Sequence, residues 1–67
     1  MDQSQIKAKV RQSVGHDITV TFGGNTETVF VVSVDPDGFI CQFLPDKGDT
    51  SAQFWMPYSV VLAATEP

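Results

Sequence analysis

Three basic side chains, Lys7, Lys9 and Arg11, lie close together near the start of the chain. Lys7 and Arg11 are four residues apart, so a helix would present them on one face. Clustered cations of this kind attract the phosphate groups of a nucleic acid. The pattern indicates either a local site for a polyanion or an ordinary solvent-exposed helix face, and both interpretations fit the spacing.

The chain offers few groups that could perform catalysis. It contains one histidine, His16, and one cysteine, Cys41, and its acidic residues are concentrated in predicted turns. Catalysis requires several such groups to converge on one point. Cys41 lies in a predicted strand, where we interpret it as a small buried residue and not as a nucleophile. We therefore expect no enzymatic activity, no cofactor and no small-molecule substrate.

The segment Asp35-Pro36-Asp37-Gly38 combines two carboxylates with the residues typical of a tight turn. Proline sets the backbone angle φ that such a turn needs, and glycine accepts the left-handed conformation. Calcium takes about six to eight oxygen ligands, so two carboxylates are far too few to hold it. We therefore predict a turn with Gly38 in the left-handed conformation, and no metal site.

Composition and charge limit the classes of partner. The 67 residues carry eight acidic and four basic side chains, which gives a net charge of −4 at pH 7. Residues 1–14 are positive overall and residues 15–67 are negative, so a local basic site is possible but broad, nonspecific binding to nucleic acid is not expected. No apolar run is long enough to cross a bilayer, and the polar start differs from a signal peptide. We expect a cytoplasmic protein without membrane partners.

Hydrophobic periodicity predicts one short helix followed by several strands. Ile6, Val10 and Val14 recur every four residues, as they would on one face of a helix spanning residues 3–13. Apolar residues then alternate with polar ones from residue 17 onward, which is the pattern of a half-buried strand. The predicted strands are 17–22, 27–34, 39–44, 52–56 and 59–64.

Short connections join these strands into a meander. Gly23-Gly24-Asn25 supplies the positive φ angles of a tight hairpin, and residues 45–51 form a predicted solvent-exposed loop. A flat sheet this small could not bury its apolar face, so the strands must curl. We predict a mainly β fold with one domain, 1–67, in which a helix at 3–13 precedes a five-stranded, strongly bent antiparallel SH3-like barrel at 16–64.

Two segments near the end of the chain are more apolar than a monomer of this fold requires. Phe54 and Trp55 are neighbours in a predicted strand and must point to opposite faces, and residues 60–64 form a continuous apolar run. A monomer would expose an apolar patch and an unpaired strand edge, unless the helix or the tail covers them. Pairing of these two strands between copies, repeated head to tail, would close a ring and stabilise a small core. The predicted subunit interface consists of Phe54, Trp55, Val60, Val61, Leu62 and Ala63.

The order of a helix and five strands with turns at these positions resembles the Sm and Sm-like proteins, the family that includes the bacterial RNA chaperone Hfq. Residues 17–44 resemble the family's first motif, a bent strand pair that ends in an Asp-containing loop, with Val34-Asp35 at its hydrophobic-Asp step. Residues 52–60, Ala-Gln-Phe-Trp-Met-Pro-Tyr-Ser-Val, are similar to the Hfq segment Ser-Gln-Met-Val-Tyr-Lys-His-Ala-Ile. Gln53 and the hydrophobic positions carry that match. The compact, acidic form also resembles Sm-like sequences of phage or marine environmental origin.

The chain departs from the family at residues that would contact RNA. Phe39 stands where the family commonly has an RNA-contacting Asn, and Met56, Pro57 and Tyr58 stand in place of Tyr-Lys-His, so the uridine pocket loses its cation. Tyr58 or Phe39 could still stack on a base. Together with the basic helix face, the resemblance implies an RNA-binding set of Lys7, Lys9, Arg11, Asp35, Phe39, Met56, Pro57 and Tyr58.

The resemblance implies a function as well as a fold. It implies a closed homo-oligomeric ring, pentamer to heptamer, that binds single-stranded RNA as a chaperone or RNA-processing factor. The negative net charge favours an alternative, a protein-binding or structural ring, for example in phage assembly, that binds no nucleic acid.

Overall fold

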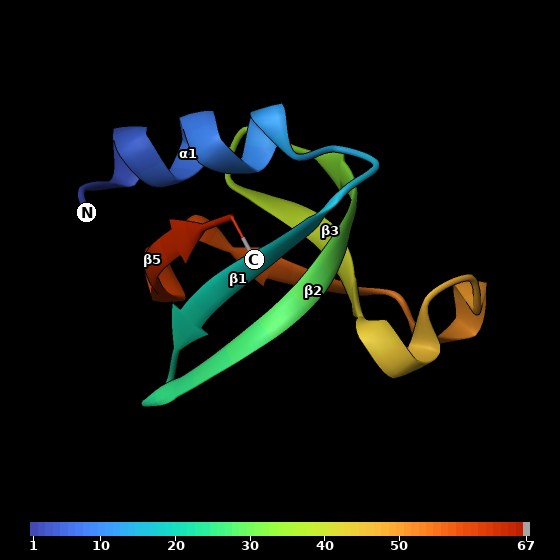
Figure 1. Ribbon diagram of the computed structural model, residues 1–67. Coiled ribbons are helices and arrows are strands. Elements are labelled where there is room, and N and C mark those ends of the chain that lie inside the picture. Colours follow the sequence, from blue (N-terminus) through green and yellow to red (C-terminus); the bar gives the residue numbers. More distant parts are fainter. Residues whose placement is uncertain (67) are drawn as a thin grey trace.

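The computed structural model describes residues 1–66 and shows a mainly β protein with one N-terminal helix, as predicted (Figure 1). The predicted domain also includes Pro67, which lies outside the described residues. The helix and strands are α1 (Gln3–Gln12), β1 (Asp17–Phe22), β2 (Asn25–Val34), β3 (Gly38–Phe43), β4 (Phe54–Pro57) and β5 (Val61–Thr65). Three short 3-10 helices lie between the later strands: η1 (Leu44–Asp46), η2 (Thr50–Ala52) and η3 (Tyr58–Val60).

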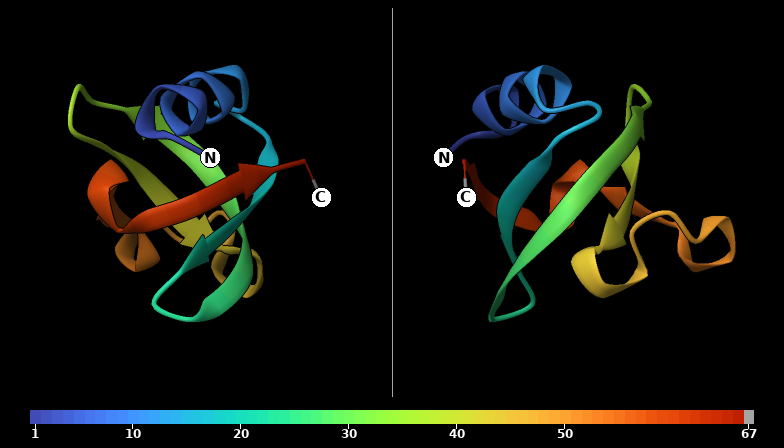
Figure 2. Two further views of the ribbon diagram at one scale, coloured as in Figure 1. Left: turned by 90° about the vertical axis from the view of Figure 1, so that its left-hand side faces the viewer. Right: turned by 45° about the vertical axis from the view of Figure 1, so that its right-hand side comes forward.

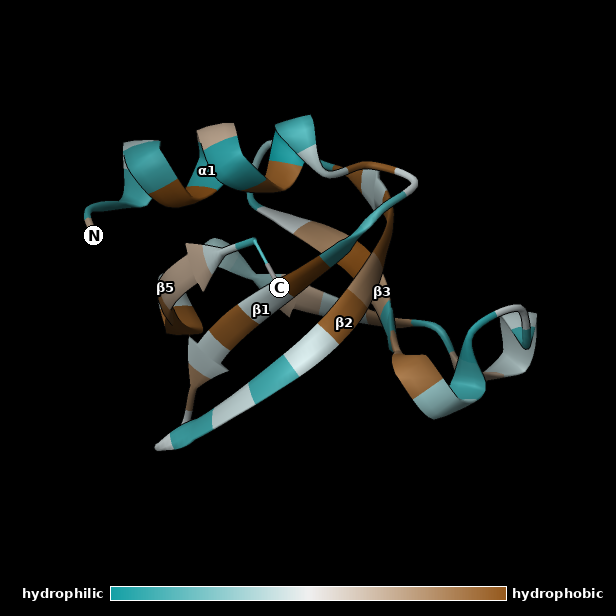
Figure 3. Cartoon of the chain, viewed as in Figure 1, coloured by the Kyte–Doolittle hydropathy of each residue, from teal (hydrophilic) through white to brown (hydrophobic). Residues whose placement is uncertain are grey.

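Helix α1 has a capped start and one buried face. At its start, the Asp2 carboxylate accepts a hydrogen bond from the Gln5 backbone N–H at 2.9 Å, and the Gln5 side chain accepts one from the Asp2 N–H at 3.0 Å. This reciprocal pair satisfies N–H groups that the first helical turn leaves free. Its apolar stripe buries Ile6 and Val10 against the sheet, and the stripe is visible on the underside of α1 in Figure 3.

The five strands form one antiparallel sheet in the order β4-β3-β2-β1-β5. Strands β1 to β4 follow one another as neighbours, and β5 returns to pair with β1. The predicted barrel is wrong in one respect, because the sheet curls but does not close: β4 and β5 are its two edges and are not paired with each other (Figure 2). The three-residue helix η3 takes the chain directly from one edge to the other. The predicted fourth and fifth strands began too early, since Ala52 lies in η2 and Ser59 and Val60 lie in η3.

The core lies inside the curled sheet, beneath α1. Along β1 the predicted alternation is confirmed, because Ile18 and Val20 are fully buried and their neighbours are only partly buried. The register of β2 against β3 shifts between Val31 and Ser33. This bulge bends β2 at the segment whose residues are apolar on both faces.

Two turns show different uses of glycine. Gly23 and Gly24 adopt positive φ angles of 54° and 79° in the β1–β2 hairpin, as predicted. The prediction for Gly38 is wrong, since it is not among the glycines with positive φ. The two ends of the turn are joined by the Asp35 N–H, which donates to the Gly38 carbonyl at 2.8 Å. A glycine is needed at this position for another reason. The Met56 backbone and the Trp55 side chain of β4 approach Gly38 too closely to leave room for a Cβ atom.

No helix within residues 1–66 is long and apolar enough to cross a membrane.

Candidate functional site: the free sheet edges and the Trp55 pocket

A pocket of about 300 Å³ lies where the start of α1 meets the β3 turn and the β4–η3 segment. We call it the Trp55 pocket, and it is lined by Gln3, Lys7, Asp37, Trp55, Pro57, Tyr58 and Ser59. Of the predicted RNA-binding residues, it brings together Lys7, Pro57 and Tyr58. Gln3, Asp37 and Ser59 were not predicted, because their segments meet only in the folded chain.

Tyr58 forms the inner wall of this pocket. The side chain is 1% exposed, and its hydroxyl has no hydrogen-bond partner within the described chain. Its ring stacks on Phe39 with centroids 5.7 Å apart, and the Lys7 ammonium nitrogen lies 5.6 Å from the Tyr58 centroid. Burial raises the pKa of Tyr58, an effect that the nearby Arg11 charge opposes and Asp35 reinforces. The hydroxyl therefore stays protonated, and it lies beneath the surface of the pocket.

Trp55 forms the outer wall. Its indole is 47% exposed and approaches Gly38 so closely that a Cβ atom there would lie 2.7 Å from two carbons of the indole six-membered ring. An exposed indole held in this way is suited to stack on a planar group. Sequence reasoning assigned Trp55 to the subunit interface, and the structure places it at both the β4 edge and the pocket.

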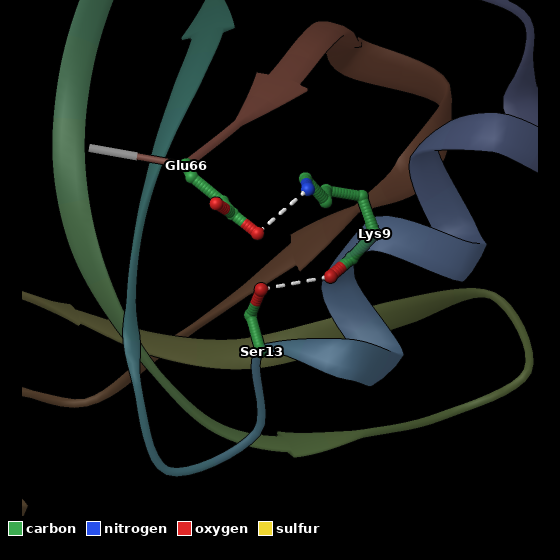
Figure 4. Close-up of polar contacts among 3 residues, drawn as sticks. All are labelled: Lys9, Ser13 and Glu66. Carbon is green, nitrogen blue, oxygen red and sulfur yellow. Dashed lines mark hydrogen bonds and ion pairs between the residues drawn. The ribbon is translucent and has the colours of Figure 1, made fainter.

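The three cations of α1 lie in three different environments. Lys7 lies over Tyr58, whereas Lys9 forms an ion pair with Glu66 at 3.1 Å, as Figure 4 shows. Arg11 is exposed and makes no ion pair with any residue that the structure describes. The helix therefore presents two cations free to attract phosphate, one of them at the mouth of the pocket.

The other predicted RNA-binding residues are not all at the surface. Phe39 and Met56 are buried in the core, at 0% and 4% exposure, so neither can contact a ligand directly. Phe39 instead supports the ring of Tyr58 from behind. Asp35 is exposed in the turn before β3.

The predicted interface residues occupy both edges of the sheet. Phe54 packs partly into the core and lies 5.0 Å, centroid to centroid, from Phe43. Three of the predicted interface residues are exposed: Trp55 on β4, Val60 in η3 and Leu62 on β5, at 47%, 45% and 60% exposure. Val61 is buried and Ala63 is partly buried. Helix α1 packs against β5, but it leaves these three side chains uncovered.

Residues 1–66 contain no group of three metal-ligating side chains. The Cys41 thiol is buried, and burial raises its pKa to about 12, so it is not a nucleophilic thiolate at neutral pH. Comparison of the chain with protein-family models, with curated proteins and with solved structures gives no match.

Proposed function

We propose that this chain is an Sm-like protein that assembles into a closed homo-oligomeric ring and binds single-stranded RNA as a chaperone or RNA-processing factor. One observation carries the proposal: within residues 1–66, neither edge of the single antiparallel sheet pairs with a further strand, and both edges carry exposed apolar side chains. The Trp55 pocket at one of these edges supports the RNA part.

Pairing of β4 in one copy with β5 in the next would satisfy both edges. A free edge presents N–H and C=O groups that readily pair with another strand. In such a pair, the outer face of one sheet continues into the outer face of the next. The outward-facing Trp55 and the exposed Leu62 of the neighbour would therefore lie on the same face. The contact is head to tail, and its repetition closes a ring when the rotation between successive copies divides a full turn.

The Trp55 pocket would then lie beside each contact between copies. Lys7 and Arg11 supply positive charge, and Trp55 supplies an exposed ring for a base. Single-stranded nucleic acid is commonly held by this combination of cations and aromatic rings. The strongly acidic remainder of the chain confines RNA to this side.

Light scattering tests the ring. One chain has a mass of 7.3 kDa, and we expect a species of pentamer to heptamer mass. Leu62→Asp places a charge in the contact and is expected to give a monomer, whereas Asn25→Asp adds the same charge at the exposed hairpin and leaves the mass unchanged. A wild-type protein that stays at 7.3 kDa at high concentration overturns the ring.

Anisotropy with short U-rich and A-rich RNA at low salt tests the ligand, since phosphate attraction is strongest there. Lys7→Gln should weaken binding, and Lys47→Gln, which removes the same charge far from the pocket, should have little effect. Absence of binding to either RNA overturns the RNA part and leaves the ring to be judged by its mass.

The excess of eight acidic over four basic side chains favours a second candidate, a protein-binding or structural ring without nucleic acid. Pull-down from a host lysate with and without nuclease separates the two. Partners that remain after nuclease treatment favour the protein-binding ring.

A further inference from the structure

A second pocket, of about 370 Å³, lies between the start of β2 and the end of β3. We call it the acidic pocket, and it is lined by Glu27, Thr28, Phe43, Pro45 and Asp46. Strands β2 and β3 are interior strands of the sheet, so pairing of the two edges between copies would not use them. One acidic pocket per subunit would remain open in the ring.

The walls and rim of this pocket differ in chemistry. Phe43 is 37% exposed, and with Pro45 it gives an apolar, partly aromatic wall. Glu27 and Asp46 add two exposed carboxylates, and neither carboxylate forms an ion pair or hydrogen bond with a residue that the structure describes. An aromatic ring beside uncompensated carboxylates favours a cation that carries an aliphatic stem.

The chain itself shows what such an arrangement binds. The Lys47 ammonium nitrogen lies 3.3 Å from an Asp17 carboxylate oxygen and 4.7 Å from the centroid of the Phe30 ring. Phe30 is two residues beyond Thr28 on β2, and Lys47 directly follows Asp46, so this occupied site is built from the same segments of the chain as the acidic pocket. The acidic pocket presents the same combination, a phenyl ring with carboxylates, without a lysine of this chain.

We propose that the acidic pocket binds a lysine or arginine side chain of a partner protein. The charged head would lie between Glu27 and Asp46, and the aliphatic stem would pack on Phe43 and Pro45. This function is separate from RNA binding, because both carboxylates repel phosphate. In a ring, several identical pockets would bind a partner with repeated basic residues far more tightly than one pocket does.

Anisotropy of a fluorescein-labelled Gly-Arg-Gly-Arg-Gly peptide with the full chain tests this proposal. Its citrulline counterpart has the same shape without the charge, and we expect it to bind at least about tenfold more weakly. Glu27→Gln should weaken binding of the arginine peptide about fivefold, and Phe43→Leu about threefold. Asp35→Asn removes the same charge from an exposed turn that does not line the pocket, and it should leave the affinity unchanged.

Three results would overturn the proposal. The first is no binding of the arginine peptide, and the second is equal weakening by Glu27→Gln and Asp35→Asn, which would assign the effect to net charge. The third is a several-fold increase in affinity on Lys47→Met, which would show that the chain's own lysine fills the pocket. All of these are independent of the mass of the ring and of its RNA affinity.

Discussion

Gly38 of β3 lies directly against the Trp55 indole of β4. A Cβ atom at Gly38 would lie 2.7 Å from two carbons of the Trp55 indole and 2.5 Å from the Met56 carbonyl oxygen. The indole can move aside, but the carbonyl belongs to the β3–β4 ladder and cannot move without disturbing it. The absence of a side chain at Gly38 therefore allows β4 to lie against β3 with Trp55 folded over it.

We expect Gly38→Ala to lower the free energy of unfolding by about 2 kcal/mol, because it overpacks this contact. Urea denaturation followed by Trp55 fluorescence measures the loss. The same substitution in a Trp55→Ala background, followed by circular dichroism, distinguishes the effect of the Trp55 indole from that of the Met56 carbonyl. Most of the loss in the free energy of unfolding should persist in the Trp55→Ala background. If Gly38→Ala causes no loss in that background, the clash is with the indole and not with the carbonyl.

Trp55 is the only tryptophan, so its emission reports on the proposed contact between copies. The indole is 47% exposed in a single chain and should become less exposed beside the neighbouring Leu62 in the ring, while its pocket side stays open to a base. Dilution is expected to shift the emission to longer wavelength as the ring dissociates. Leu62→Asp should show the long-wavelength emission at every concentration. Emission that does not change while light scattering follows dissociation would remove Trp55 from the contact.

Cys41 makes stability depend on alkaline pH. Burial raises the pKa of its thiol from 9.0 to about 12 in the folded protein, so the unfolded chain releases this proton first. Stability is fully present below pH 9 and is lost as the pH rises from 9 toward 12, by at most about 1.4 kcal/mol per pH unit. Urea denaturation of the wild type and of Cys41→Ala between pH 8 and 10.5 should show a steeper decline in the wild type. Parallel declines would contradict the assignment to Cys41.

Gln42 holds the loop after β3. Its side chain is 2% exposed, and its amide nitrogen donates to the Asp49 carbonyl at 2.7 Å and to the Asp46 carbonyl at 3.2 Å. The side-chain oxygen also accepts from the Gly48 N–H at 3.5 Å, so Gln42→Ala removes three hydrogen bonds and should cost about 1–3 kcal/mol. Backbone amides of residues 46–49 should then exchange faster by hydrogen exchange. Gln53→Ala, at an exposed position, is the control and should leave these rates unchanged.

Tyr58→Phe separates stability from ligand binding. The hydroxyl is buried without a protein partner among residues 1–66, so its removal should leave stability unchanged or raise it by up to about 1 kcal/mol. RNA affinity should stay unchanged, because the hydroxyl is buried out of reach of a ligand in the Trp55 pocket. Thermal denaturation and RNA anisotropy measure the two effects. A large loss of stability would show that the hydroxyl has a partner in the folded protein, such as a bound water.

Local features of the fold follow from the sequence with good accuracy. The spacing of Ile6 and Val10 predicted α1, and the alternation of Ile18 and Val20 predicted β1, because periodicity reflects which face of an element is buried. Sheet closure was predicted wrongly. Closure depends on whether β4 pairs with β5, and the residue pattern within each strand does not determine whether two edges of a sheet meet.

In the candidate site too, local features were predicted and features that depend on long-range contacts were missed. Lys7 and Tyr58 were identified by residue type, and the structure brings them together. Gln3 and Asp37 were missed because a pocket wall formed by a helix and a distant turn leaves no periodic signal. Gly38 was noticed for its turn, but its function depends on Trp55 and Met56, which are distant in sequence.

The three residues of η3 have a geometric consequence for assembly. They link the two edges of the sheet directly, and Tyr58 anchors them because its side chain is buried against Phe39. If copies join by these edges, the direction of β4 relative to β5 contributes to the rotation from one subunit to the next, which is about 72° in a pentamer and about 51° in a heptamer. The length of this short helix is therefore one determinant of how many copies close the circle in the proposed ring.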